Sequence, residues 1–142
     1  MDGLRRILAR PWLVRAAQVG IGVVLAWAGL AKIVDQAGFA AQVHNFKLVP
    51  IAVENLIAMT LPWVELVTAH ALIFGVRARA GAVLASGLVG VFTLAVLAAL
   101  ARGMDIECGC FGTGDASRVG WIKLGQNLAM LAVAVVGTLR PR

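Results

Sequence analysis

Charged side chains are scarce in this sequence. Asp, Glu, Lys and Arg together make up 14% of its 142 residues, whereas about 25% is usual in soluble globular proteins. Hydrophobic residues make up 61%, against about 45–50% in soluble chains. A water-soluble domain of this size would need many more polar side chains to cover its surface. The composition therefore excludes an ordinary soluble domain and indicates that lipid surrounds much of the chain.

Cysteine is also rare, since the sequence contains only Cys108 and Cys110. Two thiols cannot build the disulfide framework of a small secreted domain. They also cannot supply a four-cysteine zinc site or an iron–sulfur cluster without other ligands. Any chemistry at these cysteines therefore has to arise from a single, closely spaced pair.

Four long apolar segments contain most of the hydrophobic residues. They cover residues 13–34, 51–76, 80–101 and 119–139. Each has at least the ~20 residues that a helix needs to cross the ~30 Å hydrocarbon core of a bilayer. None alternates polar and apolar residues as a membrane strand does. The sequence therefore predicts an all-α integral membrane protein, a four-helix bundle in a single domain over residues 1–142.

A shorter amphipathic segment connects the first two apolar segments. Residues 36–50 place Phe39, Val43 and Phe46 among polar side chains. A helix with one apolar and one polar face can lie in the plane of the membrane interface. We predict a short interfacial helix here, between the first and second membrane helices; an ordinary tethering loop is the alternative.

The basic residues predict the orientation of the helices. With four membrane helices, eight basic residues fall on the side of the two termini and five on the opposite side. Because cytoplasmic loops carry an excess of Lys and Arg, we expect both termini in the cytoplasm of a bacterium and residues 102–118 outside its cytoplasmic membrane. This distribution also accounts for the net charge of +6, so no nucleic-acid partner is expected.

The predicted outer loop contains Cys108 and Cys110, separated by Gly109. A disulfide between such close cysteines closes a small, strained ring, and strained disulfides are easier to reduce. Glycine permits the backbone angles that this ring requires, and disulfides persist outside the cytoplasm. The pattern favours thiol–disulfide exchange without a metal ion. Three alternatives remain open: unreactive free thiols, a permanent structural disulfide, and metal binding with His44 or another chain.

Glu65 lies near the middle of the second apolar segment. An ionised carboxylate there is costly unless it faces the bundle interior and is paired. Glu54 lies about three helical turns earlier on the same face, and its position favours it as the partner of Lys32, at the end of the first segment. A proton relay through Glu65 would suit a thiol oxidation that releases protons; a structural polar contact between helices is the alternative.

Other polar and aromatic residues accompany the cysteine loop. Lys123, Gln126 and Asn127 have the spacing of one helix face at the start of the fourth segment. The candidate aromatic contacts for a ring-shaped cofactor such as a quinone are Trp63, Phe111 and Trp121. An interfacial belt is the more common role of such tryptophans.

Several short motifs occur in the order found in a known family. They are Gly29-Leu30-Ala31-Lys32, Phe46-Lys47-Leu48-Val49-Pro50, Leu61-Pro62-Trp63-Val64-Glu65, Cys108-Gly109-Cys110-Phe111-Gly112, Trp121 and Gln126-Asn127. With them, nearly the whole chain resembles the MauE/DoxX-like membrane proteins, most closely the methylamine-utilisation MauE branch. The resemblance implies a four-helix membrane bundle associated with redox and disulfide chemistry. In that family, DoxX proteins are linked to quinone-coupled sulfur oxidation, and MauE to maturation of the disulfide-rich small subunit of methylamine dehydrogenase.

Together these patterns predict a membrane thiol–disulfide oxidoreductase or redox relay. Cys108 and Cys110 would exchange disulfides with an extracytoplasmic protein, and a quinone is the candidate electron acceptor. A second hypothesis is a non-enzymatic accessory subunit of a larger membrane redox complex, with the cysteine loop as a docking element or metal site. A third is a small transporter that uses Glu65 and His70.

Overall fold

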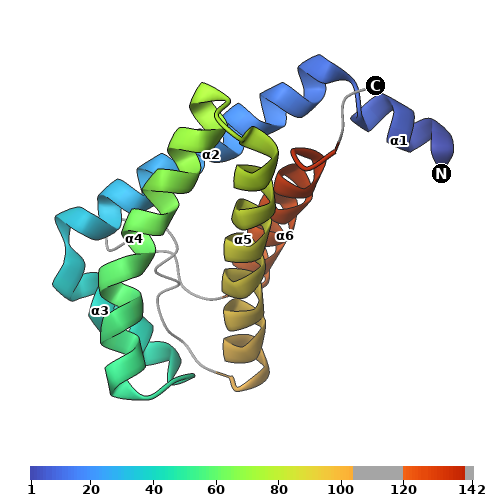
Figure 1. The fold of residues 1–142 in the computed structure, drawn as a ribbon. Coiled ribbons are helices and arrows are strands. Elements are labelled where there is room, and N and C mark those ends of the chain that lie inside the picture. Colours follow the sequence, from blue (N-terminus) through green and yellow to red (C-terminus); the bar gives the residue numbers. More distant parts are fainter. Residues whose placement is uncertain (104–119, 140–142) are drawn as a thin grey trace.

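The computed structural model describes residues 1–103 and 120–139 (Figure 1). Within these ranges the chain forms six helices and no strand. The helices are α1 (Asp2–Leu8), α2 (Pro11–Val34), α3 (Gln36–Phe46), α4 (Ile51–Phe74), α5 (Ala78–Ala101) and α6 (Trp121–Val136). The predicted all-α class is confirmed for this part of the chain.

Three of these helices are long and apolar enough to cross a membrane. α2, α4 and α5 each have 24 residues, which at 1.5 Å per residue gives about 36 Å, more than the ~30 Å of a hydrocarbon core. Their outer faces expose large apolar side chains such as Trp27, Val67 and Leu94, which lipid solvates and water does not. α6 is apolar but has only 16 residues, so the fourth predicted segment is the least complete of the four.

The segment between α2 and α4 is a helix, as predicted, over Gln36–Phe46. It packs against α4, and Phe39 and Gln42 are buried. Pro62 inside α4 has no N–H, so the carbonyl group of Ala58 loses its helical partner. The side chain of Gln36 donates a hydrogen bond to that carbonyl oxygen at 3.5 Å. The start of α3 is therefore attached to α4 where the proline interrupts the helical hydrogen bonding.

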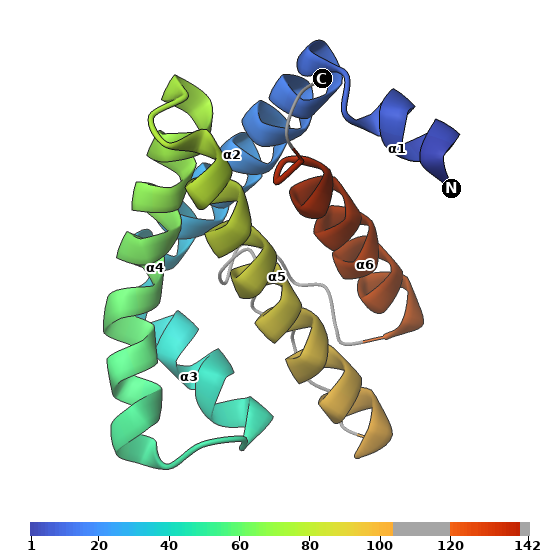
Figure 2. The same cartoon turned by 45° about the vertical axis from the view of Figure 1, so that its right-hand side comes forward.

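Two polar residues near the start of α2 hydrogen-bond to the ends of other helices. Arg15 donates to the carbonyl oxygens of Leu72 and Ile73, in the last turn of α4. Gln18 donates to the carbonyl oxygen of Gly137, just after α6, at 2.9 Å. Carbonyl groups in a last helical turn have no intrahelical partner, and leaving them unsatisfied in apolar surroundings is costly. α2 thus joins the ends of α4 and α6, at the upper end of the bundle in Figure 2.

The helices α2 and α4 approach each other closely because α2 presents glycine at the contact. A Cβ atom added to Gly22 would lie 2.8 Å from Cγ1 of Ile73, and one added to Gly29 would lie 3.0 Å from the carbonyl oxygen of Pro62. Small residues allow this close backbone approach, on which helix association in lipid depends. The contact between α2 and α4 is what brings the charged residues of the two helices together.

Gly22→Ala is expected to destabilise the bundle relative to Gly20→Ala, the matched control in the same helix. A Cβ atom at Gly20 meets nothing within 4 Å, and both substitutions gain the same intrinsic helix propensity. The difference in free energy of unfolding should therefore report overpacking alone, about 1–3 kcal/mol. Denaturant unfolding in mixed micelles measures it. Equal stability of the two variants would show that α2 and α4 are less tightly packed than described.

Candidate functional site

A buried ion pair joins α2 to α4 in the interior of the bundle. The Lys32 Nζ atom lies 2.9 and 3.0 Å from the two carboxylate oxygens of Glu65. Lys32 is 0% exposed and Glu65 is 1% exposed. The expectation that Glu65 faces the interior and is paired is confirmed, whereas the prediction that Lys32 pairs with Glu54 is wrong. Side chains on a helix lean toward its N-terminus, so Lys32 reaches back along α2 toward Glu65 rather than outward to Glu54.

Two aromatic rings also lie close to the Lys32 ammonium group. Its Nζ atom lies 5.3 Å from the ring centre of Phe39 on α3 and 5.2 Å from that of Phe92 on α5. Both distances are within the ~6 Å range of cation–π attraction. Four helices, α2 to α5, therefore meet at one ammonium group. The sequence analysis missed both rings as partners of Lys32; their apolar character indicated burial but not contact with a cation.

Glu54 takes part in a second, separate pair. Its carboxylate lies 2.8 Å from Nδ1 of His44, at the other end of α3 from Gln36. The Glu54 side chain is buried, whereas that of His44 is 56% exposed. This pair connects α3 to the start of α4. In the described part of the chain no group of three or more His, Cys, Asp or Glu residues is placed to hold a metal ion.

α6 contributes Asn127 to the interior. Asn127 and Lys123 are buried, but Gln126 is exposed, so two of the three polar residues face the interior. A step of three residues turns the helix by about 300° and a step of four by about 400°, which places Gln126 at the edge of the face that Lys123 and Asn127 share. A cavity of about 30 Å³ lies between Asn127 and Glu65, with Phe92 and Met130 in its wall. The lining of this cavity is almost entirely apolar, so it does not offer the polar partners that a buried water molecule needs.

An apolar groove lies beside Phe39 and Phe92. It has a volume of about 450 Å³ and runs between α3, α4 and α5. Phe39 and Phe92 line both this groove and the surroundings of Lys32. Among its other lining residues are Val43, Leu61 and Leu88, and Gln42 is the polar one. The sequence did not indicate this groove, because its walls come from three different helices, α3, α4 and α5. How these helices pack against one another cannot be read from the sequence of any one of them.

Trp63 and Trp121 lie away from the ion pair and the groove. Their exposed fractions are 60% and 76%, and neither lines the groove. His70 is exposed as well and stacks on Phe74, with 4.6 Å between ring centres, so it does not share the buried face of Glu65. The transporter hypothesis, which combined Glu65 with His70, therefore has no common site in the described residues.

Cys108, Cys110 and Phe111 lie outside the described residues. α5 ends at Ala101, and the described part of the chain stops at Gly103 and resumes at Gly120. Both the end of α5 and the start of α6 lie on the side of the bundle away from α1 (Figure 2). At the end of α5, Arg102 donates a hydrogen bond of 2.9 Å to the carbonyl oxygen of Phe46, the last residue of α3. Arg102, which precedes the cysteine segment in the sequence, is thus connected to the same helix that carries Phe39.

Comparisons with known proteins agree over most of the chain. The model of a family described as "Methylamine utilisation protein MauE" matches residues 10–140. A protein named "Methylamine utilization protein MauE" from Methylorubrum extorquens is 36% identical, over 92% of this chain and 70% of its own length. Proteins of the same name from Paracoccus versutus and Paracoccus denitrificans are 32% and 31% identical, over 93% and 90% of this chain and 72% and 69% of theirs. No solved structure matches the chain.

Proposed function

The chain belongs to the MauE family, and from this premise we propose that it is a membrane accessory protein of methylamine utilisation that performs thiol–disulfide exchange through Cys108 and Cys110. The observation that carries the proposal is the buried pair of Lys32 and Glu65. Ionisable groups inside a membrane protein are expensive and mark functional sites by default. Here the pair lies beside a cavity and an apolar groove, in a chain with one closely spaced cysteine pair.

The exchange balances as a two-electron transfer. A thiolate of an extracytoplasmic dithiol protein attacks one sulfur of the Cys108–Cys110 disulfide and displaces the other as a thiolate. The second thiol of the substrate then resolves the mixed disulfide, so that the substrate leaves oxidised and both cysteines remain reduced. Reoxidation of the pair needs an acceptor for two electrons and two protons. A quinone, which becomes a quinol, is the proposed acceptor.

The groove between α3, α4 and α5 is the proposed quinone site. Its volume of about 450 Å³ lies within the usual ~300–1,000 Å³ of small-molecule sites, and its apolar walls suit a lipid-soluble ring. The rings of Phe39 and Phe92 would separate the quinone from Lys32. The carboxylate of Glu65 would be the group that accepts protons released at the thiols.

The proposal includes a topology. α6 is the fourth membrane helix beside α2, α4 and α5, and α3 lies at the outer interface. The excess of basic residues on the side of the termini favours a cytoplasmic location for the termini and an extracytoplasmic one for the cysteine loop. In that orientation the cysteines meet a compartment in which disulfides persist.

The redox state of the two cysteines in native membranes tests the proposal. Each free thiol that reacts with a maleimide-linked polymer slows the protein on a denaturing gel. We expect ready reduction of the pair by a mild dithiol, followed by reoxidation that depends on added quinone analogue. The variant with both cysteines replaced by serine supplies the unshifted control. A pair that stays oxidised, or stays reduced and unreactive, under all conditions would refute the redox role.

A non-enzymatic accessory subunit is the second candidate. The observation that favours it is the presence of only two cysteines in the sequence, because a dedicated quinone-linked thiol oxidase usually relays electrons through a second cysteine pair. In that case the loop would serve as a docking element in a larger membrane redox complex.

A further inference from the structure

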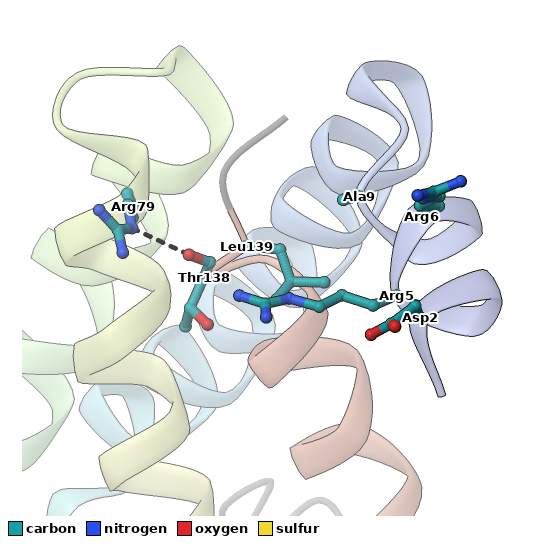
Figure 3. A pocket seen from close by; sticks show the side chains of 7 residues that line it. All are labelled: Asp2, Arg5, Arg6, Ala9, Arg79, Thr138 and Leu139. Carbon is teal, nitrogen blue, oxygen red and sulfur yellow. Dashed lines mark hydrogen bonds between the residues drawn. The ribbon is translucent and has the colours of Figure 1, made fainter. Parts of the chain in front are cut away.

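A pocket of about 710 Å³ (Figure 3) lies beside α1, at the end of the bundle opposite α3 (Figure 1). Its walls come from three places that are distant in sequence: α1, the first turn of α5, and the residues that follow α6. The lining side chains that matter here are Asp2, Arg5, Arg6, Arg79, Thr138 and Leu139. None of them belongs to the Lys32–Glu65 site.

The pocket has an excess of positive charge. Three arginines and one aspartate line it, which gives a formal charge of +2. The Arg79 Nε atom donates a hydrogen bond of 2.9 Å to the carbonyl oxygen of Thr138. Figure 3 shows Arg5 extending from α1 toward Thr138, with Arg79 on the other side of that residue. Two guanidinium groups from different helices thus flank one space, and guanidinium groups bind phosphate oxygens in bidentate fashion.

The helix that carries Arg5 and Arg6 has the character of a membrane-surface helix. α1 has no buried residue, and Leu4 and Ile7 are exposed. At 100° per residue its charged side chains fall on one face and its apolar side chains on the other. A short helix with a basic polar face and an uncovered apolar face lies at the level of lipid headgroups.

From these observations we propose that the pocket between α1, α5 and the end of α6 binds the phosphate headgroup of an anionic phospholipid. The three arginines supply the charge complementarity. The exposed Leu4 and Ile7 would contact the acyl chains of the same leaflet, which argues for a lipid rather than a free phosphate. Basic pockets beside membrane helices recognise anionic headgroups in this way. The site is independent of the proposed thiol chemistry.

Native mass spectrometry of the full chain in detergent tests this site, with added phosphatidylglycerol and phosphatidylcholine of the same acyl chains as probes. We expect phosphatidylglycerol to bind at least ~10-fold more tightly than phosphatidylcholine. The double variant Arg5→Gln/Arg79→Gln should lose about fivefold in phosphatidylglycerol affinity per arginine removed. The single variant Arg5→Gln keeps the Arg79–Thr138 hydrogen bond, so it should show about a fivefold loss in a fully folded protein.

Two matched controls carry the same change in charge. Arg77→Gln lies at the same end of the bundle but outside the pocket, and Lys47→Gln lies beyond α3 at the opposite end. Both should keep phosphatidylglycerol affinity within about twofold of the unmodified chain, since headgroup attraction is local. The proposal is overturned by equal affinity for the two lipids, by unchanged affinity in the Arg5→Gln variant, or by equal losses in the controls. Displacement of the lipid by inorganic phosphate at equal concentration would overturn the assignment to a lipid.

Discussion

Lys32→Met alone is expected to lower the free energy of unfolding by about 3–5 kcal/mol, because it leaves the Glu65 carboxylate buried without its partner. The side chain of Glu65 is only 2% exposed, so solvent water cannot replace the lost contacts of its carboxylate. Glu65→Met should also be damaging, since it removes the carboxylate that lies 2.9 Å from the buried Lys32 ammonium group. Unfolding by denaturant in mixed micelles, followed by circular dichroism, measures both variants.

The double variant Lys32→Met/Glu65→Met distinguishes pairing from packing. Replacing both members of a buried ion pair with apolar residues of similar volume is often neutral or stabilising. We therefore expect the double variant to recover most of the stability that each single variant loses. His44→Gln is the control, because it removes the partly exposed partner of Glu54 and should cost at most about 1 kcal/mol. If Lys32→Met is no more damaging than His44→Gln, the buried pair described here is not formed.

The same double variant separates a structural role of the pair from a functional one. If a folded Lys32→Met/Glu65→Met protein still shows quinone-dependent reoxidation of its cysteines, the ion pair has only a structural role as a contact between helices. We expect reoxidation to slow markedly instead, since the variant lacks the groups that would accept and pass on protons. Reoxidation is followed by the maleimide gel shift, at equal amounts of folded protein.

The sequence predicted the helices well because their cause is local. The length of an apolar run is a property of neighbouring residues, and α2, α4 and α5 lie within or close to the predicted runs at 13–34, 51–76 and 80–101. The burial of Glu65 also followed from the sequence, since an isolated charge cannot face lipid. α1 was missed because seven residues with three charges give too short a pattern to distinguish a helix from a polar tail.

The partners within the site could not be predicted in the same way. Whether Lys32 meets Glu54 or Glu65 depends on how far the lysine side chain leans along α2 and on how α2 and α4 are aligned. Whether Glu54 needs Lys32 at all depends on His44, which α3 brings to it. These are relations between helices, and hydrophobic periodicity within one helix contains no information about them. The exposure of Gln126 shows the same limit, because burial at the edge of a helix face depends on the neighbouring helices.

Single replacement of Cys108 or Cys110 by serine is expected to abolish electron transfer from a dithiol to a quinone. Each variant keeps one thiol, but it cannot form the intramolecular disulfide that the proposed exchange requires. In proteoliposomes with dithiothreitol as donor and a soluble quinone analogue as acceptor, the rate should fall to the uncatalysed level. Thr113→Ser, in the same segment of the sequence, is the control and should keep the rate of the unmodified chain.

The same variants decide between the redox enzyme and the accessory subunit when assembly is measured beside activity. A redox enzyme retains its native complex, seen by gel electrophoresis in mild detergent, while it loses electron transfer. A docking loop predicts the reverse, because loss of a cysteine would release the membrane partners of a chain that never catalysed the transfer. The two outcomes exclude each other: intact assembly with lost transfer supports exchange at the cysteine pair, and lost assembly without any dithiol-to-quinone activity in the unmodified chain refutes it.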